Sequence, residues 1–365
     1  MLCYEYPPIG GGGAKVVHGL TNALSKMNCE IDLVTMGYKG LPYFEKVDNM
    51  NIYRVKCLRF NKNICTYPEM LTYIISAFPL VLKLARINKY IINHTHFIFP
   101  DGVLAYLLHK FNGLNYVITA HGSDVPGYNP NRFKTLHKLL RPFWNRIVKT
   151  SKKIVFPSNN LNELFKAVND KVEGIIIPNG INLNKFSHLK QKEKQILVVS
   201  RMFERKGVQY VLKAFSGLET DYNLNIVGDG PFLENLKNLS RELNVKANFL
   251  GFVDNSSEEL KRLYEDSEIF IFTSESENFP IVLLEAMLAG MAIITSKNTG
   301  CAEVIGDSGI LVDPKDSNII RKELVKLMSD KQLLKTLQLS ARNRVEELFG
   351  WDGIAHHYMK LYENH

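Results

Sequence analysis

Short runs of apolar, often β-branched residues alternate with helical patterns along the whole chain. Such alternation is typical of βαβ units and parallel sheets. In the first half, the expected strands are Ile31–Val34, Tyr90–Ile92, Tyr116–Thr119 and Ile154–Phe156. In the second half, they are Gln195–Val199, Leu224–Val227, Asn248–Leu250, Glu268–Phe272 and Ala292–Thr295. The pattern therefore predicts an α/β chain in which one doubly wound domain follows another.

Residues 174–190 (GIIIPNGINLNKFSHLK) interrupt this alternation with a short strand followed by Pro, Asn and Gly. Only MLCYEYPP precedes a glycine loop at 10–13, which predicts either a shortened first strand or a strand that starts upstream of Met1. The expected organisation is an N-terminal Rossmann-like domain at 1–173, a linker at 174–193, a second Rossmann-like domain at 194–348, and a C-terminal helix at 349–365 that crosses back to the first domain.

The composition is that of a globular protein, since 45% of the 365 residues are apolar. No uninterrupted apolar run approaches ~20 residues, so no transmembrane helix is expected. The most apolar window, Met70–Ala85, is cut by Pro79. The N-terminus lacks the basic region of a secretory signal. The five cysteines form no C-x-x-C pair, which favours a reducing cytosol over a disulfide or zinc framework.

The charge is divided unevenly along the chain. Residues 1–190 contain 24 Lys/Arg and 11 Asp/Glu, a net +13, whereas residues 191–365 contain 21 and 26, a net −5. A basic half and an acidic half indicate different partners. The basic half suits anionic lipid, an acidic glycan or nucleic acid. No RNP-type motif, finger spacing or arginine-rich arm is present, so we expect no nucleic-acid partner.

Residues 7–20 (PPIGGGGAKVVHGL) place four glycines before an amphipathic helix. Glycines allow close approach of the backbone to a ligand, and a helix N-terminus attracts anions. A dinucleotide fingerprint fails here, because its third glycine would fall on Lys15 or Val16. Gly12 and Gly13 are therefore candidates for a phosphate contact, with a flexible turn as the alternative.

Residues 119–127 (TAHGSDVPG) follow an expected strand, so His121 should emerge at its carboxyl end, with Asp124 nearby. Open α/β sheets bind ligands at these ends, although a lone histidine is often structural. His94 and His96 would project from one face of a strand. A metal site needs a third ligand with comparable placement, and we find none, so we expect packing there and no metal.

Residues 198–207 (VVSRMFERKG) end a strand and lead into a helix near Gly207. Arg201 and Lys206, beside the N–H groups of that helix, suit a diphosphate; the alternative is a solvated basic loop. Residues 225–231 (NIVGDGP) form another strand and glycine turn, in which the glycines can serve the turn alone. The third glycine of a G-x-G-x-x-G dinucleotide fingerprint would fall on Leu233, so this segment does not match that fingerprint either.

Residues 273–290 (TSESENFPIVLLEAMLAG) carry Glu277 and Glu285 on either side of Pro280. Because proline suits the first helical position, Glu277 should lie in the loop before a helix and Glu285 in its second turn. Carboxylates accept hydrogen bonds from vicinal sugar hydroxyls, with about 1.5–3 kcal/mol for each charged contact. Two carboxylates and two cations together predict a nucleotide sugar, which carries a diphosphate between two sets of hydroxyls.

These motifs resemble the family 4 glycosyltransferases over essentially the whole chain. The resemblance is carried by PPIGGGGA, HGSD, IPNGIN, SRMFERKG, VGDGP, FLGFV and the E-x7-E pair at Glu277 and Glu285. It implies the GT-B fold, two facing Rossmann-like doubly wound domains with a ligand cleft between them. It also implies a retaining enzyme that moves a hexose-type sugar from a UDP- or GDP-type nucleotide sugar to an acceptor hydroxyl, without metal or other cofactor. The acceptors would belong to cell-envelope polysaccharide, lipopolysaccharide or glycolipid synthesis.

The resemblance also implies roles by position. Arg201 and Lys206 become diphosphate ligands, Glu285 the acceptor for ribose hydroxyls, and Glu277 the residue that holds the transferred sugar. His121 would contact the sugar near the reaction centre. The remaining donor contacts would come from Gly12, Gly13, Phe252, Val253, Asn278 and Phe279. The family often has Gly-Phe-Gly-like residues where this chain has Asn-Phe-Pro, so the N–H at position 280 is lost.

The implied transition state is oxocarbenium-like, with negative charge on the leaving diphosphate. Arg201 and Lys206 would stabilise that charge, and the leaving phosphate would help to deprotonate the acceptor on the same face. A pyridoxal-phosphate phosphorylase of this fold would need a Schiff-base lysine. A nucleotide-sugar epimerase would release free sugar, and a non-catalytic nucleotide-sugar-binding module would lack His121 or a glutamate. Since all these residues are present, an enzyme is favoured.

Residues 131–153 (NRFKTLHKLLRPFWNRIVKTSKK) combine an apolar helical face with many cations. The apolar face comprises Phe133, Leu136, Leu140, Phe143, Trp144, Ile147 and Val148, and predicts packing on a sheet. The cations are Arg132, Lys134, Lys138, Arg141, Lys149, Lys152 and Lys153. With the net +13 of the first half, they predict a cytoplasmic protein bound peripherally to an anionic membrane, where a lipid or lipid-linked acceptor is met.

Overall fold

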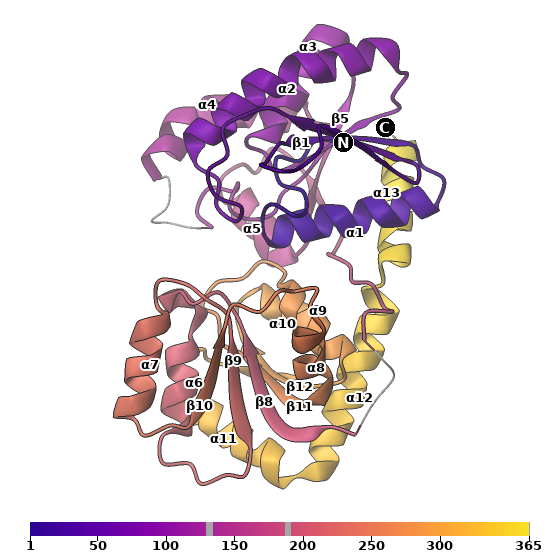
Figure 1. Cartoon of the computed structure of the whole chain (residues 1–365). Coiled ribbons are helices and arrows are strands. Elements are labelled where there is room, and N and C mark those ends of the chain that lie inside the picture. The colour runs from indigo at the N-terminus through magenta and orange to yellow at the C-terminus, as the bar shows by residue number, and fades with distance from the viewer. Residues whose placement is uncertain (129–133, 187–190, 365) are drawn as a thin grey trace. The chain divides into compact units, whose positions relative to one another are not determined.

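The computed structural model describes residues 1–128, 134–186 and 191–364, with the backbone alone at 134–140 (Figure 1). The chain divides into two compact units. The first contains Met1–Gly180 and Trp351–His365, and the second contains Ile181–Gly350. The C-terminal helix therefore belongs with the N-terminal unit.

The first unit contains two groups of paired strands, with the orders β2–β3–β1 and β4–β5–β6–β7. Leu2 joins the two groups, because it forms parallel bridges to Val34 and to Thr95. Only β2 and β3 pair antiparallel among the described strands. The first strand is thus reduced to a bridging segment, held by hydrogen bonds such as that from the His96 N–H to the Leu2 carbonyl at 2.9 Å. The strands are β1 (Ile31–Met36), β2 (Phe44–Val47), β3 (Met50–Val55), β4 (Asn93–His96), β5 (Tyr116–Thr119), β6 (Lys153–Phe156) and β7 (Gly174–Ile176).

The helices of the first unit are α1 (Gly12–Lys26), α2 (Tyr67–Ile87), α3 (Asp101–Asn112), α4 (Lys134–Thr150), α5 (Asn159–Lys166) and α13 (Trp351–Glu363). Helix α2 begins with a capping box in which Thr66 and Glu69 satisfy each other's backbone N–H groups. Helix α3 ends at Gly113, whose left-handed conformation suits glycine. Helices α2 and α3 pack side by side, and α1 packs against α13.

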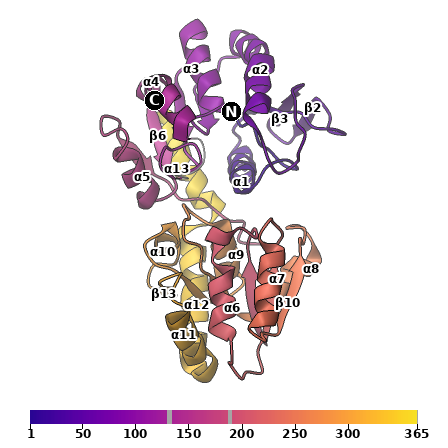
Figure 2. The same cartoon turned by 90° about the vertical axis from the view of Figure 1, so that its left-hand side faces the viewer.

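The second unit contains a parallel sheet with the strand order β10–β9–β8–β11–β12–β13. Successive residues of its central strands feed two separate cores: Ile196 and Val198 belong to one, and Leu197 and Val199 to the other. This alternation means that both faces of the sheet are covered. Figure 2 shows α6, α7 and α11, which line one of these cores. The strands are β8 (Glu193–Val199), β9 (Asn223–Val227), β10 (Ala247–Gly251), β11 (Ser267–Phe272), β12 (Ala292–Ser296) and β13 (Ile310–Val312).

The helices of the second unit follow its strands in turn. They are the 3₁₀ helix η1 (Glu204–Lys206) and the α-helices α6 (Val208–Phe215), α7 (Leu233–Glu242), α8 (Glu258–Asp266), α9 (Ile281–Leu288), α10 (Gly300–Ile305), α11 (Ser317–Ser329) and α12 (Lys331–Leu348). Helix α9 packs against α10 and α12, on the core opposite to that of α6 and α11.

The strand predictions are confirmed with one exception. The apolar triplet Tyr90–Ile92 is not a strand, and Ile91 is 82% exposed. The strand is β4 instead. Its His94 side chain has partners in the core, since it lies 2.8 Å from the Thr119 hydroxyl and 2.6 Å from that of Tyr362. The sequence also failed to predict β2, β3 and β13.

Two further expectations need correction. Residues 174–180 of the linker expected at 174–193 belong to the first unit, where β7 pairs with β6, and the second unit begins directly after them at Ile181. Pro79 does not interrupt its apolar window, since α2 continues through it. Among the described residues, α2 is the one helix long and apolar enough to cross a membrane by length and composition.

The helix expected around 131–153 lies partly outside the described residues, which exclude 129–133 and the side chains of 134–140. In the part that is described, Trp144, Ile147 and Val148 are buried, as the apolar face predicts, whereas Phe143 is 36% exposed. Arg141 and Lys149 are exposed.

The side chain of Trp351 on α13 packs closely against two glycines. A Cβ at Gly19 would lie 2.1 Å from the Trp351 Nε1, and one at Gly180 would lie 2.6 Å from its Cδ2. We predict that Gly19→Ala lowers the free energy of unfolding by about 1–3 kcal/mol, because the ring must shift. The measurement is urea unfolding followed by tryptophan fluorescence.

Gly353→Ala is the matched control, because a Cβ at Gly353 in α13 would have no atom within 4 Å. It should leave stability unchanged or raise it by up to ~1 kcal/mol. Equal destabilisation by both substitutions would contradict the proposed packing.

Candidate active site

The second unit has a topological switch point at β8. The chain passes from β8 to β9 on one side and later returns to β11 on the other. The loops that leave the carboxyl ends of β8 and β11 therefore diverge, and ligands of open α/β sheets bind at such points. The loop after β8 carries Arg201 and Lys206, and the loop after β11 carries Glu277.

These two loops are packed directly on each other. Gly207 has φ +75°, and a Cβ there would lie 2.0 Å from the Thr273 carbonyl oxygen. The Glu275 N–H donates to the Arg205 carbonyl at 2.9 Å. Close backbone contact of this kind admits only glycine at position 207.

The contact brings Lys206 and Glu277 together. The Lys206 Nζ forms an ion pair with Glu277, and both side chains are largely buried, with exposures of 9% and 12%. The same ammonium lies 5.6 Å from the centre of the Phe272 ring. Arg201 is exposed, with its guanidinium 5.6 Å from the centre of the Phe203 ring. The site thus offers one buried and one accessible cation beside a carboxylate.

The residues after Glu277 are fixed by their surroundings. The Gly300 N–H donates to the Glu277 carbonyl at 3.0 Å, and a Cβ at Gly300 would lie 1.5 Å from the Asn278 carbonyl oxygen. Asn278 and Phe279 are buried, with exposures of 6% and 7%. This burial favours backbone rather than side-chain contacts with a ligand at both positions. Pro280 precedes α9 as its N-cap, so Glu277 lies in the loop as expected.

Glu285 lies in the second turn of α9, as predicted, and is 2% exposed. It pairs with Lys185, and the Tyr264 hydroxyl donates to its Oε2 at 3.1 Å. Burial and the neighbouring carboxylate raise the pKa of Tyr264, so this hydroxyl remains a donor. Lys185 and Tyr264 were not predicted as site residues.

The other motifs of this unit follow β9 and β10. A Cβ at Gly228 would lie 1.7 Å from the Ser200 carbonyl oxygen, so this glycine serves loop packing. Beyond β10, the side chain of Phe252 is 65% exposed, whereas Val253 is buried in the core.

In the first unit, the glycine loop leads directly into α1. A Cβ at Gly11 or Gly12 would have no atom within 4 Å, whereas one at Gly13 would lie 2.6 Å from the Phe97 ring. At the start of α1, Gly11 and Gly12 therefore face open space, whereas Gly13 packs against the Phe97 ring. Gly11 is the N-cap, without a side chain to occupy the free N–H groups.

His121 follows the carboxyl end of β5, as predicted. Its Nε2 lies 3.2 Å from the His96 Nδ1, and its ring centre lies 4.4 Å from that of Phe97, with the two rings tilted by 38°. Asp124 shapes this loop by accepting hydrogen bonds from the N–H groups of Ile98, His121 and Gly122 at 2.8–3.0 Å.

The buried position of these groups sets their protonation. Burial lowers the pKa of His121 to about 3, so the imidazole is neutral at neutral pH. Burial raises the pKa of Asp124 to about 6, against the effect of its backbone donors. His94 and His96 have rings 4.1 Å apart, as a shared strand face requires, and burial lowers the pKa of both. Among the described residues, no group of three or more His, Cys, Asp or Glu could hold a metal ion.

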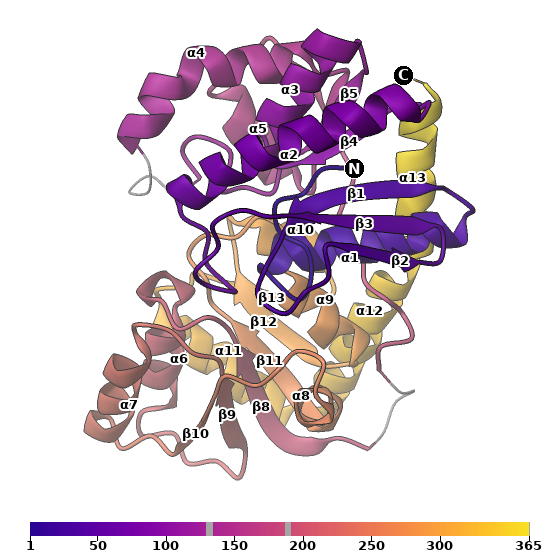
Figure 3. The ribbon, with the colours of Figure 1, turned by 45° about the horizontal axis from the view of Figure 1, so that its top comes forward.

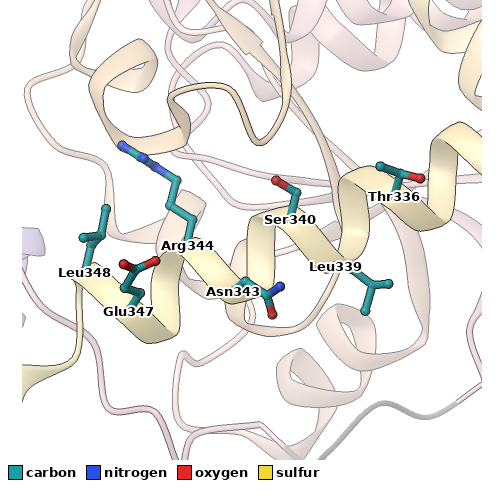
Figure 4. A pocket seen from close by; sticks show the side chains of 7 residues that line it. All are labelled: Thr336, Leu339, Ser340, Asn343, Arg344, Glu347 and Leu348. Carbon is teal, nitrogen blue, oxygen red and sulfur yellow. The ribbon is translucent and has the colours of Figure 1, made fainter.

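A separate groove of about 490 Å³ lies along α12 (Figure 4). It is lined by Thr336, Leu339, Ser340, Asn343, Arg344, Glu347 and Leu348. None of the motif residues lines it, so it is not part of the candidate site.

Two family profiles match adjoining parts of the chain. The Glycosyltransferase Family 4 profile matches residues 10–185, and the Glycosyl transferases group 1 profile matches residues 181–344. N-acetyl-alpha-D-glucosaminyl L-malate synthase of Bacillus anthracis is 28% identical over 98% of this chain and 94% of its own length.

Two solved structures share the fold. Sucrose-phosphate synthase of Thermosynechococcus elongatus gives a TM-score of 0.83 at 22% identity, covering 97% of this chain and 93% of that one. HepE of Anabaena, in complex with UDP-glucose, gives 0.78 at 16% identity, covering 100% and 98%. The fold is therefore GT-B, with two Rossmann-like units. The chain belongs to the family 4, group 1 glycosyltransferases.

The Lys206–Glu277 pair generates a prediction about stability. In a double-mutant cycle of Lys206→Met and Glu277→Gln, we expect a coupling of about 1–3 kcal/mol, because removal of one partner leaves the other charge buried. The free energies come from urea unfolding of the four proteins. The Lys194–Asp221 pair, with side-chain exposures of 51% and 65%, is the control and should couple much more weakly, because solvent screens exposed charges. Equal coupling in both pairs would contradict the assignment.

Proposed function

We propose that the chain is a retaining glycosyltransferase that moves a hexose-type sugar from a UDP- or GDP-type nucleotide sugar to an acceptor hydroxyl. One observation carries the proposal: Lys206 and Glu277 are paired at the switch point of the second sheet, with Arg201 on the same loop as Lys206. Cations at such a position suit a diphosphate, and an adjacent carboxylate suits the hydroxyls of the sugar attached to it.

In this proposal, charge develops on the diphosphate as the glycosidic bond breaks through an oxocarbenium-like transition state. Arg201 and Lys206 stabilise that charge, which is electrostatic catalysis. The leaving phosphate accepts the proton of the acceptor hydroxyl on the same face of the sugar, so the configuration is retained. His121 is neutral and binds the sugar through a hydrogen bond rather than by its charge.

The nucleoside would be bound by Glu285, whose carboxylate accepts hydrogen bonds from the ribose hydroxyls. Tyr264 holds one carboxylate oxygen and Lys185 the other, which fixes the orientation of the group. Phe252, with its exposed ring, lies in the loop that would meet the nucleobase. Gly12 and Gly13 would contribute backbone N–H groups at the start of α1, and Asn278 and Phe279 would contribute their backbone. The UDP-glucose complex of Anabaena HepE supports this class of donor.

For the acceptor, we propose a glycan, a lipid-linked glycan or a lipid of cell-envelope polysaccharide, lipopolysaccharide or glycolipid synthesis. The protein would act in the cytoplasm, on the membrane face where such acceptors occur. The net charge of +13 over residues 1–190 supports this location, because cytoplasmic leaflets are anionic.

The first test concerns the leaving group. A thermal-shift screen of UDP-, GDP- and ADP-sugars identifies the donor, because a bound ligand stabilises the folded state by mass action. With that donor, Arg201→Ala and Lys206→Ala should each lower turnover about 10²–10³-fold. Product would be measured as nucleoside diphosphate released in the presence of acceptor.

Glu277→Gln is the matched comparison at the same site. It should impair transfer while the affinity for free nucleoside diphosphate, measured by calorimetry, remains near that of the wild type. Near-normal turnover in both cation variants would refute the diphosphate assignment. Release of free sugar without acceptor would instead indicate the epimerase alternative.

The second test concerns metal. The proposed catalysis relies on Arg201 and Lys206 instead of a divalent cation, so turnover should be unchanged in excess EDTA. Addition of Mg²⁺ or Mn²⁺ should not raise it. Loss of activity in EDTA, with recovery on titration of Mn²⁺, would contradict the proposal and direct attention to His94 and His96.

A further inference from the structure

The outer face of α2 is apolar and exposed. Leu71, Ile75, Phe78 and Leu82 recur at helical spacing along it, and Leu71 and Ile75 are 53% and 73% exposed. Only 22% of the most apolar window of this helix is buried. A helix of a globular unit normally turns such residues toward the core.

Neighbouring segments extend this surface. The Leu58 N–H donates to the Thr72 hydroxyl at 3.0 Å, which holds the loop before α2 against the helix. Phe111 at the end of α3 packs on Phe78, with ring centres 5.6 Å apart. Figure 3 shows α2 and α3 side by side. We define the α2 strip as Leu58, Phe60, Ile64, Leu71, Ile75, Phe78 and Phe111, whose exposures reach 77% at Phe60.

The segment of sequence that contains the α2 strip is strongly basic. Residues 56–162 contain 15 Lys/Arg and three Asp/Glu. The three acids, Glu69, Asp101 and Asp124, are buried, with exposures of 1%, 0% and 5%. Exposed cations border the strip at Lys56, Lys62, Lys83, Arg86, Lys89 and Lys110. An apolar strip with exposed cations along its border is complementary to a surface that is apolar inside and anionic outside.

The inner face of α2 is fixed in the core of the first unit. Tyr73, Ala77 and Val81 are buried there, and the Tyr73 hydroxyl donates to the Asp101 Oδ1 at 2.8 Å. Crossing a bilayer would require α2 to leave these contacts and expose the core. The helix is therefore placed to lie on a membrane rather than to span it.

We infer that the α2 strip docks on an anionic lipid bilayer, with its apolar side chains at the level of the headgroups and its cations on the lipid phosphates. A second copy of the chain is a poorer occupant, because symmetric pairing would bring two cationic borders together. The inference rests on the proposed function for its biological purpose, since a lipid or lipid-linked acceptor lies in such a bilayer. Binding of the nucleotide sugar does not depend on it.

The test is co-sedimentation of the whole protein with phosphatidylglycerol–phosphatidylcholine vesicles and with phosphatidylcholine vesicles. The wild type should pellet with the anionic vesicles, and less at high salt. Leu71→Gln/Ile75→Gln should lower the partition coefficient at least about 10-fold through the loss of buried apolar area. Lys83→Gln/Arg86→Gln should lower the partition coefficient at least about 10-fold through the loss of charge. It should also remove most of the preference for anionic vesicles.

Leu339→Gln/Leu348→Gln on α12 is the matched control, because these leucines are 52% and 43% exposed outside the strip. It should bind vesicles as the wild type does. Equal pelleting of all variants, or of none, would overturn the inference. So would a dimer that Leu71→Gln/Ile75→Gln dissociates in size-exclusion chromatography, since the strip would then join two copies.

The thermal shift with nucleotide sugars separates this inference from the proposed function. If both α2 variants lose vesicle binding and keep the shift, the inference stands. If no nucleotide sugar stabilises any protein while vesicle binding follows the predicted pattern, the proposed function fails and the docking surface remains. An intact shift without any vesicle binding refutes the surface alone.

Discussion

The contact between the loops after β8 and β11 is the constraint on which the candidate site depends. Gly207 lies against the Thr273 carbonyl, the Glu275 N–H donates to Arg205, and Lys206 pairs with Glu277. The backbone contacts fix the two loops, and the ion pair then places a cation beside a carboxylate. A buried pair contributes little net stability compared with apolar packing, which is consistent with the ligand-binding role that we propose for it.

Glycines serve two different purposes in the motifs of this chain. At Gly228 and Gly300 a Cβ would lie 1.7 Å and 1.5 Å from carbonyl oxygens, so these residues allow loops to pack. At Gly11 and Gly12 a Cβ would meet no atom within 4 Å. Space alone does not require glycine there, and close approach of a ligand to the backbone is the reason that we propose.

The sequence predicted the parts of the fold and site that local patterns determine. Apolar strands located the carboxyl ends of β5, β8 and β11, and hence the loops of His121, Arg201 and Glu277. It failed at β4, because that strand is polar in sequence and its buried His94 is held by a distant partner, Tyr362. Lys185 was missed for the same reason: its partner Glu285 lies 100 residues away. Contacts of this range leave no periodic signal in a single sequence.

Helix α2 presents two different faces from one apolar stretch of sequence. On the inner face Tyr73 and Ala77 are buried. On the outer face the apolar pattern continues, but Ile75 is 73% exposed. The acid of this helix, Glu69, is used in the capping box at the start of the helix. The exposed charges toward the end of the helix are cationic. Such a helix packs into the core with its inner face. The apolar side chains of its outer face, together with the cations beside them, suit an environment that is apolar inside and anionic at its surface.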